Sequence, residues 1–108
     1  MHIEELREYV LQKANVIEGF PFGEDTLVFK VNTKIFALIS LTSLPLQFNA
    51  KCDPDEAINL REQYPGSVLP GYHMNKKHWN TVIVDGSLSR KQLFKMLDDS
   101  YKLVAKIK

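Results

Sequence analysis

The stretch TLVFKVNTKIFALIS, residues 26–40, decides the fold of this 108-residue chain. Its first half places Leu27, Phe29 and Val31 on one side of an extended backbone. A polar turn at residues 32–34 then leads into a second run that is rich in apolar and β-branched side chains. Two such runs joined by a short polar turn predict a β-hairpin.

Signals for helices lie on both sides of this hairpin. Between residues 3 and 15 apolar side chains recur every three or four positions, which predicts a helix with one apolar stripe. Residues 16–23 contain two glycines, one proline and two phenylalanines, and they predict an irregular connection pinned to the core by its aromatic rings. Asp53-Pro54-Asp55-Glu56 combines a capping carboxylate, a proline suited to the first turn and a glutamate that can reach back, so a second helix starts there. Ser89 caps a final amphipathic helix.

Three further strands complete the prediction. Residues 46–50 alternate apolar and polar side chains, and residues 79–84 are β-branched. Residues 68–74 are interrupted by Pro70-Gly71, which is typical of an edge strand or a bulge. The order α-β-β-β-α-β-β-α predicts an α+β two-layer sandwich, in which helices cover one face of a five-stranded antiparallel sheet. We expect residues 1–108 to form a single domain.

The composition is that of a globular protein, with 44% hydrophobic and 25% charged residues. The first residues are acidic and show no basic segment followed by an apolar one, and no apolar run is long enough to span a bilayer. The single cysteine, Cys52, excludes an internal disulfide. We therefore expect a cytoplasmic protein without a membrane segment.

No arrangement of residues in the sequence predicts catalysis. It contains no Gly-x-Ser-x-Gly motif and no glycine-rich phosphate loop. Cys52 precedes a helix whose dipole could lower the pKa of a thiol, but a free cysteine is more often a small apolar filler. His73 and His78 have no third ligand nearby to complete a zinc site. Neither a catalytic residue, a metal nor a cofactor is predicted, and an enzyme is the least expected class.

The charges are distributed unevenly. Residues 1–56 carry five Lys/Arg against nine Asp/Glu, a net of −4, whereas residues 57–108 carry nine against four, a net of +5. This asymmetry is compatible with a basic face or with solvated helices that carry both signs. The densest basic and aromatic stretch is residues 71–79, which predicts either a phosphate-contacting loop or a solvated hairpin tip with Tyr72 and Trp79 turned into the core.

Three segments together resemble the bacterial MmcQ/YjbR family: residues 20–25 with the hairpin that follows, residues 51–57 running through Leu60-Arg61 to Tyr64-Pro65, and residues 68–79. The resemblance covers essentially the whole chain. It implies a fold similar to that of type III secretion chaperones and frataxin-like domains, and DNA binding through a double-wing arrangement of hairpins. No catalytic role attaches to its motifs Pro70–His73 and Lys77–Trp79.

The first functional hypothesis is therefore DNA binding, with basic hairpin (wing) loops in contact with phosphates. The residues that would make these contacts are Lys34, Lys76, Lys77, His78, Arg90 and Lys91. The alternative is a non-enzymatic protein-interaction or chaperone-like module, a monomer or weak homodimer, that binds a partner through the sheet face or the Pro70-Gly71 edge; exposed Val28 or Phe36 would distinguish it. A third hypothesis is a small ligand between the sheet and the Phe20–Phe22 loop.

Overall fold

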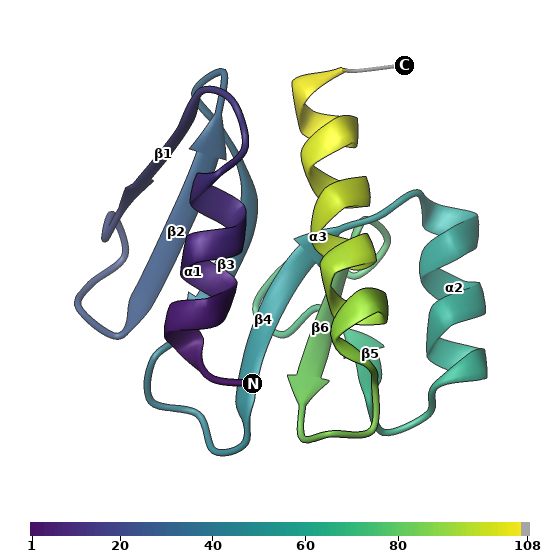
Figure 1. Ribbon diagram of the computed structural model, residues 1–108. Helices are drawn as coiled ribbons and strands as arrows, with labels where there is room; N and C mark the ends of the chain where they lie inside the picture. The colour runs from purple at the N-terminus through teal and green to yellow at the C-terminus, as the bar shows by residue number, and fades with distance from the viewer. Residues whose placement is uncertain (107–108) are drawn as a thin grey trace.

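A six-stranded sheet forms the centre of the computed structural model, which describes residues 1–106 (Figure 1). The strands lie in the order β1-β2-β3-β4-β6-β5, and all neighbours are antiparallel. The elements in chain order are α1 (Ile3–Leu11), β1 (Val16–Gly19), β2 (Thr26–Val31), β3 (Lys34–Ser40), β4 (Leu46–Lys51), α2 (Pro54–Gln63), β5 (Val68–Pro70), β6 (Trp79–Val84) and α3 (Arg90–Ala105).

The α+β class and the antiparallel sheet are confirmed, but the predicted number of five strands is wrong. Residues 16–19, expected to be irregular, form the edge strand β1 and pair with β2 from Val16↔Val31 to Gly19↔Val28. Four residues that include Glu18 and Gly19 give too short a pattern for a strand signal. Glu18 faces α1, where Arg7 of that helix binds its carboxylate.

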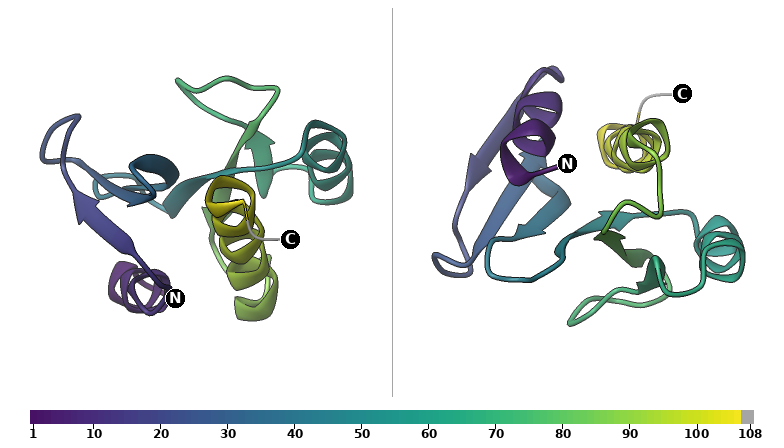
Figure 2. Two further views of the ribbon diagram at one scale, coloured as in Figure 1. Left: turned by 90° about the horizontal axis from the view of Figure 1, so that it is seen from above. Right: turned by 60° about the horizontal axis from the view of Figure 1, so that its bottom comes forward.

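Helices α1 and α3 cover one face of the sheet, whereas α2 lies beside the β5 edge (Figures 1 and 2). The expectation that all helices cover one face is therefore correct only for α1 and α3. The core fills the space between these two helices and the sheet, and it includes Leu6, Val10, Phe29, Ile39, Phe48 and Leu97, each at most 1% exposed. We call the opposite side of the sheet the open face. No helix in residues 1–106 is long and apolar enough to cross a membrane.

The predicted helix starts are confirmed in atomic detail. The Asp53 side chain accepts hydrogen bonds from the backbone N–H groups of Asp55 and Glu56, and Ser89 forms a reciprocal capping box with Gln92. The first helix ends at Leu11 rather than near Asn15, because residues 12–15 turn and Asn15 adopts a left-handed φ of 62°.

The strand predicted over residues 68–74 extends only over residues 68–70. It is an edge strand, as predicted, because β5 is the last strand of the sheet. Gly71 begins a long connection to β6, so the second half of the predicted strand is a loop.

Candidate functional site

The open face contains a groove of about 470 Å³, a volume typical of ligand pockets. Its floor is formed by side chains of β3 and β4, and loops form its two walls. We call this cavity the sheet groove; its lining includes Phe22, Leu38, Gln47, Asn49, Tyr72 and His73.

One wall belongs to residues 20–25, which we call the Phe loop. The Phe loop turns through a hydrogen bond from the Gly23 N–H to the Phe20 carbonyl, with Gly23 at a φ of 115° that favours glycine. Phe20 and Phe22 are 52% and 65% exposed, so the expectation that they pin the loop to the core is wrong. The loop itself projects beyond the ends of β1 and β2 (Figure 2), and neither ring belongs to the core cluster.

The other wall belongs to residues 71–78, which we call the Lys loop. Gly71 starts the loop and donates a hydrogen bond to the Trp79 carbonyl at 2.9 Å. A Cβ atom at position 71 would lie 2.8 Å from the Cβ of Trp79, so only glycine fits this close approach. Tyr72 is 64% exposed, with its ring centroid 4.0 Å from that of His73, whereas Trp79 is half-buried. The alternative in which both aromatics turn into the core is thus wrong for Tyr72.

Arg61 on α2 holds the far end of the Lys loop. Its Nε donates to Oδ1 of Asn80 at 2.7 Å, and its guanidinium also donates to the carbonyls of Lys76 and Trp79. This role of Arg61 could not be predicted from the sequence, since one arginine on a polar helix face carries no local signal. The only sequence hint was its place beside Leu60 in the second family-like segment.

A chain of hydrogen bonds connects the Lys loop to the floor of the sheet groove. The backbone N–H of Tyr72 donates to Thr81 Oγ1 at 2.9 Å, and that hydroxyl donates to Oδ1 of Asn49. The amide of Asn49 is therefore oriented with its NH₂ group available. Within residues 1–106, neither this NH₂ group nor the Gln47 amide has a side-chain hydrogen bond to the protein, and neither is a buried unsatisfied group.

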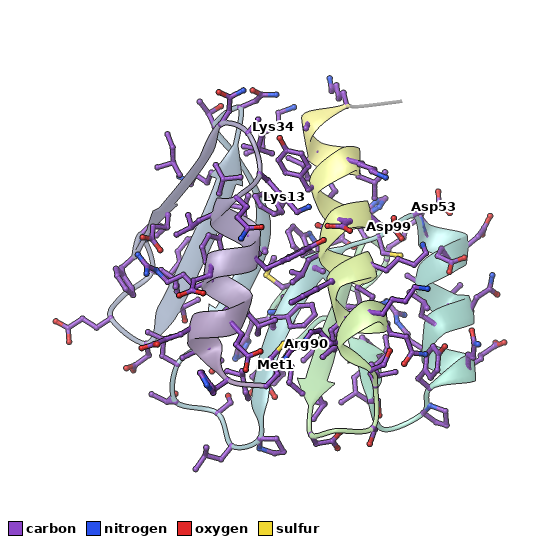
Figure 3. All side chains as sticks on the ribbon, viewed as in Figure 1. Met1, Lys13, Lys34, Asp53, Arg90 and Asp99 are labelled. Carbon is purple, nitrogen blue, oxygen red and sulfur yellow. The ribbon has the colours of Figure 1, made fainter. Side chains whose placement is uncertain are left out.

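The structure separates the six basic residues predicted to contact DNA. Lys76, Lys77 and His78 lie in the Lys loop before β6, whereas Arg90 and Lys91 follow the opposite end of that strand. Lys34 lies at the β2–β3 turn, and Figure 3 shows it and Arg90 at opposite ends of the molecule. Arg90 also pairs with Glu5 of α1 at 2.5 Å.

The ion pairs found in residues 1–106 all involve α1 or α3. They are His2–Glu5, Arg7–Glu18, Lys13–Asp98, Arg90–Glu5 and Lys95–Asp99. On the open side, Lys30, Lys76 and Lys77 belong to none of these pairs, and the Phe loop carries Glu24 and Asp25. On the helix-covered side, the exposed Lys91 and Lys102 of α3 are likewise outside these pairs.

The two residues proposed to mark a protein-interaction module are buried. Phe36 is 0% exposed because it lies at a bulge and packs against Tyr101 of α3 with a ring centroid distance of 5.3 Å. Val28 is 1% exposed because β1 makes β2 an interior strand, which places Val28 between Gly19 and Leu38. The expectation that either side chain is exposed is wrong.

Residues 1–106 contain no cluster of three or more His, Cys, Asp or Glu side chains that could hold a metal ion. Cys52 is half-buried, and burial, followed by the nearby carboxylates of Glu56 and Asp53, raises the pKa of its thiol to about 11. At neutral pH this thiol is protonated, as expected for an apolar filler rather than a nucleophile.

Alkylation tests this state of Cys52. A thiol pKa of about 11 lowers the thiolate fraction at neutral pH by about 100-fold relative to a thiol of ordinary pKa. We expect iodoacetamide to modify the folded chain correspondingly more slowly than the guanidinium-unfolded chain, with a rate that rises with pH until about 11. Equal rates in both states at neutral pH would contradict the assignment.

The fold and the sheet groove define a small α+β sandwich with one open face between two projecting loops. The chain belongs to the YjbR family, whose model matches residues 11–103. The resemblance of the three segments to this family is therefore confirmed.

The relatives agree with this placement. The chain is 43% identical to the uncharacterised protein YbdF of Escherichia coli O157:H7 over 79% of this chain and 69% of that protein. It is 32% identical to the uncharacterised protein YjbR of Escherichia coli K12, over 94% and 86% of the two chains.

Two solved structures have the same fold. The crystal structure of Deinococcus radiodurans protein DR2400, with a DUF419 domain, is 41% identical with a TM-score of 0.91, over 96% of this chain and 78% of that one. A crystal structure of a Pseudomonas syringae protein is 27% identical with a TM-score of 0.82, over 96% and 99% of the chains. The names of these relatives assign them no activity.

Proposed function

We propose that the protein binds DNA through the open face, with Lys76 and Lys77 in contact with phosphates and with little preference for sequence. The observation that carries this proposal is the position of two unpaired lysines on a loop that projects from the open face. The ion pairs of the described residues lie on the side of α1 and α3, whereas these two lysines are in no ion pair. Unpaired lysines on a projecting loop gain most from a polyanion, because binding releases its counterions.

Contacts within the protein order the Lys loop before it meets DNA. Gly71 and Trp79 close its base through a backbone hydrogen bond, and Arg61 binds the carbonyl of Lys76. A loop that is already ordered loses little conformational entropy when it binds. The Nζ of Lys76 donates to the Gly71 carbonyl at 3.2 Å, so its charge lies at the loop base, and both Lys76 and Lys77 are exposed.

The proposal retains only some of the six basic residues that were predicted from the sequence to contact DNA. Arg90 is paired with Glu5 on the helix-covered side, and Lys34 lies at the β2–β3 turn. The Phe loop carries Glu24 and Asp25, which would repel phosphates, so it does not act as a second basic wing. The contact to the backbone therefore depends on the Lys loop, with the half-buried His78 beside it.

Salt dependence tests the proposal. We expect a fluorescein-labelled duplex to bind with a dissociation constant of about 1–100 µM near 50 mM salt and to bind several-fold more weakly near 200 mM. The variant Lys76→Ala/Lys77→Ala should weaken binding and reduce the slope of log K against log salt by about 2, one unit for each lost phosphate contact. Fluorescence anisotropy measures both quantities.

A matched control is Lys91→Ala/Lys102→Ala, which removes two exposed lysines of α3 and lowers the net charge equally. It should leave the salt slope nearly unchanged. If the two double variants weaken binding equally, net charge rather than the Lys loop explains the affinity. If the wild-type chain does not bind at low salt, the proposal fails, and a partner at the unpaired edge of β1, where Ile17 is 71% exposed, becomes the better candidate.

A further inference from the structure

We propose that the sheet groove binds one unpaired base of a DNA single strand, while the Lys loop contacts the adjoining phosphates. This inference rests on the proposed DNA binding and specifies which form of DNA is preferred. Three features support it: the exposed aromatic rings in the groove walls, the amides on its floor, and the lysines in the loop that forms one of its walls.

The walls offer rings on which a base can stack. Phe22 and Tyr72 come from different loops, line the same cavity, and are 65% and 64% exposed. Single-strand-binding proteins use exposed aromatic rings in this way, because every base presents a π-face. Phe20, in the same loop as Phe22, is 52% exposed but is not part of the groove lining.

The floor offers hydrogen bonds to the edge of a base. The oriented amide of Asn49 presents its NH₂ group, and Gln47 lies two residues away on the same strand and the same face. Amides of this type pair with base edges through one donor and one acceptor. An apolar peptide in the groove would leave both amides without partners, a cost that disfavours it as the occupant.

The lysines of the Lys loop supply the contact to the phosphates next to the bound base. Tyr72 lies in the same loop as Lys76 and Lys77, so a base stacked on its ring has its own backbone beside this loop. A duplex cannot use the floor in the same way, because its bases are stacked and their pairing edges are occupied. The groove therefore favours a single strand, or a base that has left its duplex.

Three matched labelled oligonucleotides test the inference by anisotropy: a single strand, the same strand with abasic sites at its central positions, and the duplex. We expect the single strand to bind at least about fivefold more tightly than the abasic strand, the effect of losing one base–aromatic stack. Phe22→Ala should remove this difference and leave duplex affinity unchanged, whereas Phe20→Ala should retain it.

A second measurement does not depend on affinity. In ¹⁵N–¹H spectra, the side-chain NH₂ signals of Asn49 and Gln47 should shift when the single strand is added, and the abasic strand should shift them much less. An additional variant, Gln47→Ala, should weaken the single strand selectively and provides a check if Phe22→Ala alters the loop.

The outcomes separate the inference from the function on which it rests. If all three oligonucleotides bind equally, and Lys76→Ala/Lys77→Ala weakens each of them, then DNA binding stands and the base site is wrong. If none of them binds near 50 mM salt, both proposals fail. If the single strand binds but Phe20→Ala and Phe22→Ala weaken it equally, the groove is not the site.

Discussion

Replacing Ser100 with alanine is expected to lower the free energy of unfolding by about 2–4 kcal/mol, although the change removes only one oxygen atom. Ser100 is 0% exposed on α3, and its Oγ donates to the Phe36 carbonyl at 2.5 Å. The same Oγ accepts the N–H of Lys51 at 2.8 Å. The hydroxyl therefore satisfies a strand carbonyl at the β3 bulge and an N–H at the end of β4.

The size of the effect follows from the two backbone groups that lose their hydrogen-bond partner in the alanine variant. Phe36 has no partner residue on β2, because Phe29 pairs with Ala37 and Lys30 with Ile35. A buried backbone group that loses its partner costs about 1–3 kcal/mol, and here two groups lose the same one. The lost volume is small, so a cavity contributes little.

Denaturant unfolding of Ser100→Ala measures this loss, and amide hydrogen exchange at Lys51 should become faster. Ser87→Ala, at an exposed serine, is the control and should change stability by less than about 0.5 kcal/mol. If Ser100→Ala changes stability as little as the control does, another group must satisfy the Phe36 carbonyl.

Local chemistry explains why much of the fold is predictable from the sequence. The β2–β3 hairpin follows from two β-rich runs around a turn, and the structure places Asn32 and Thr33 of that turn at positive φ. The start of α2 follows from a carboxylate and a proline that act on backbone groups within three residues. In both cases the residues that decide the element are inside the element.

The missed features depend on residues that are distant in the chain. Strand β1 exists because β2 supplies its hydrogen bonds, and Arg61 reaches residues 15–19 positions away. The exposure of Phe22 and the burial of Val28 depend on how loops and strands assemble, and a periodicity test cannot reveal this.

The candidate site shows the same difference between features set by neighbouring residues and features set by residues distant in the chain. Residues 71–79 could be predicted as a candidate site because basic and aromatic side chains are adjacent there in the chain. Arg90 and Lys91 were grouped with them only by charge, and the structure places these two residues beyond the opposite end of β6. The floor amides Gln47 and Asn49 gave no signal, because alternate polar residues are ordinary on a strand with one wet face.

Replacing Asp98 with asparagine is expected to loosen the contact between α1 and α3 and to lower the pKa of Tyr9. The Tyr9 hydroxyl donates to both carboxylate oxygens of Asp98, at 2.7 and 2.9 Å, and Lys13 forms an ion pair with the same group. The Tyr9 ring also stacks on Phe94 of α3, with ring centroids 3.7 Å apart. Burial first, and then the hydrogen bond to Asp98 and its charge, raise the pKa of Tyr9 to about 12.

The sign of the pH dependence follows from this direction. Because the folded state favours the neutral phenol, the stabilisation from Tyr9 is fully present below its ordinary pKa near 10 and is lost as the pH rises through about 12. Asp98→Asn removes the negative charge, so the pKa of Tyr9 should fall, and the alkaline loss of stability should become smaller. At neutral pH the variant should lose about 2 kcal/mol, because the hydrogen bond loses its charged acceptor and Lys13 loses its counterion.

Ultraviolet absorbance of tyrosinate as a function of pH measures the ionisation of the tyrosines. The variant Tyr9→Phe identifies which part of that titration belongs to Tyr9. Thermal unfolding at neutral pH gives the stability change. The control is Asp99→Asn, which breaks the exposed pair with Lys95 and should cost less than about 0.5 kcal/mol. An unchanged pKa of Tyr9 in Asp98→Asn would show that burial alone raises it. Equal destabilisation by the two asparagine variants would show that the partly buried pair adds nothing beyond an exposed one.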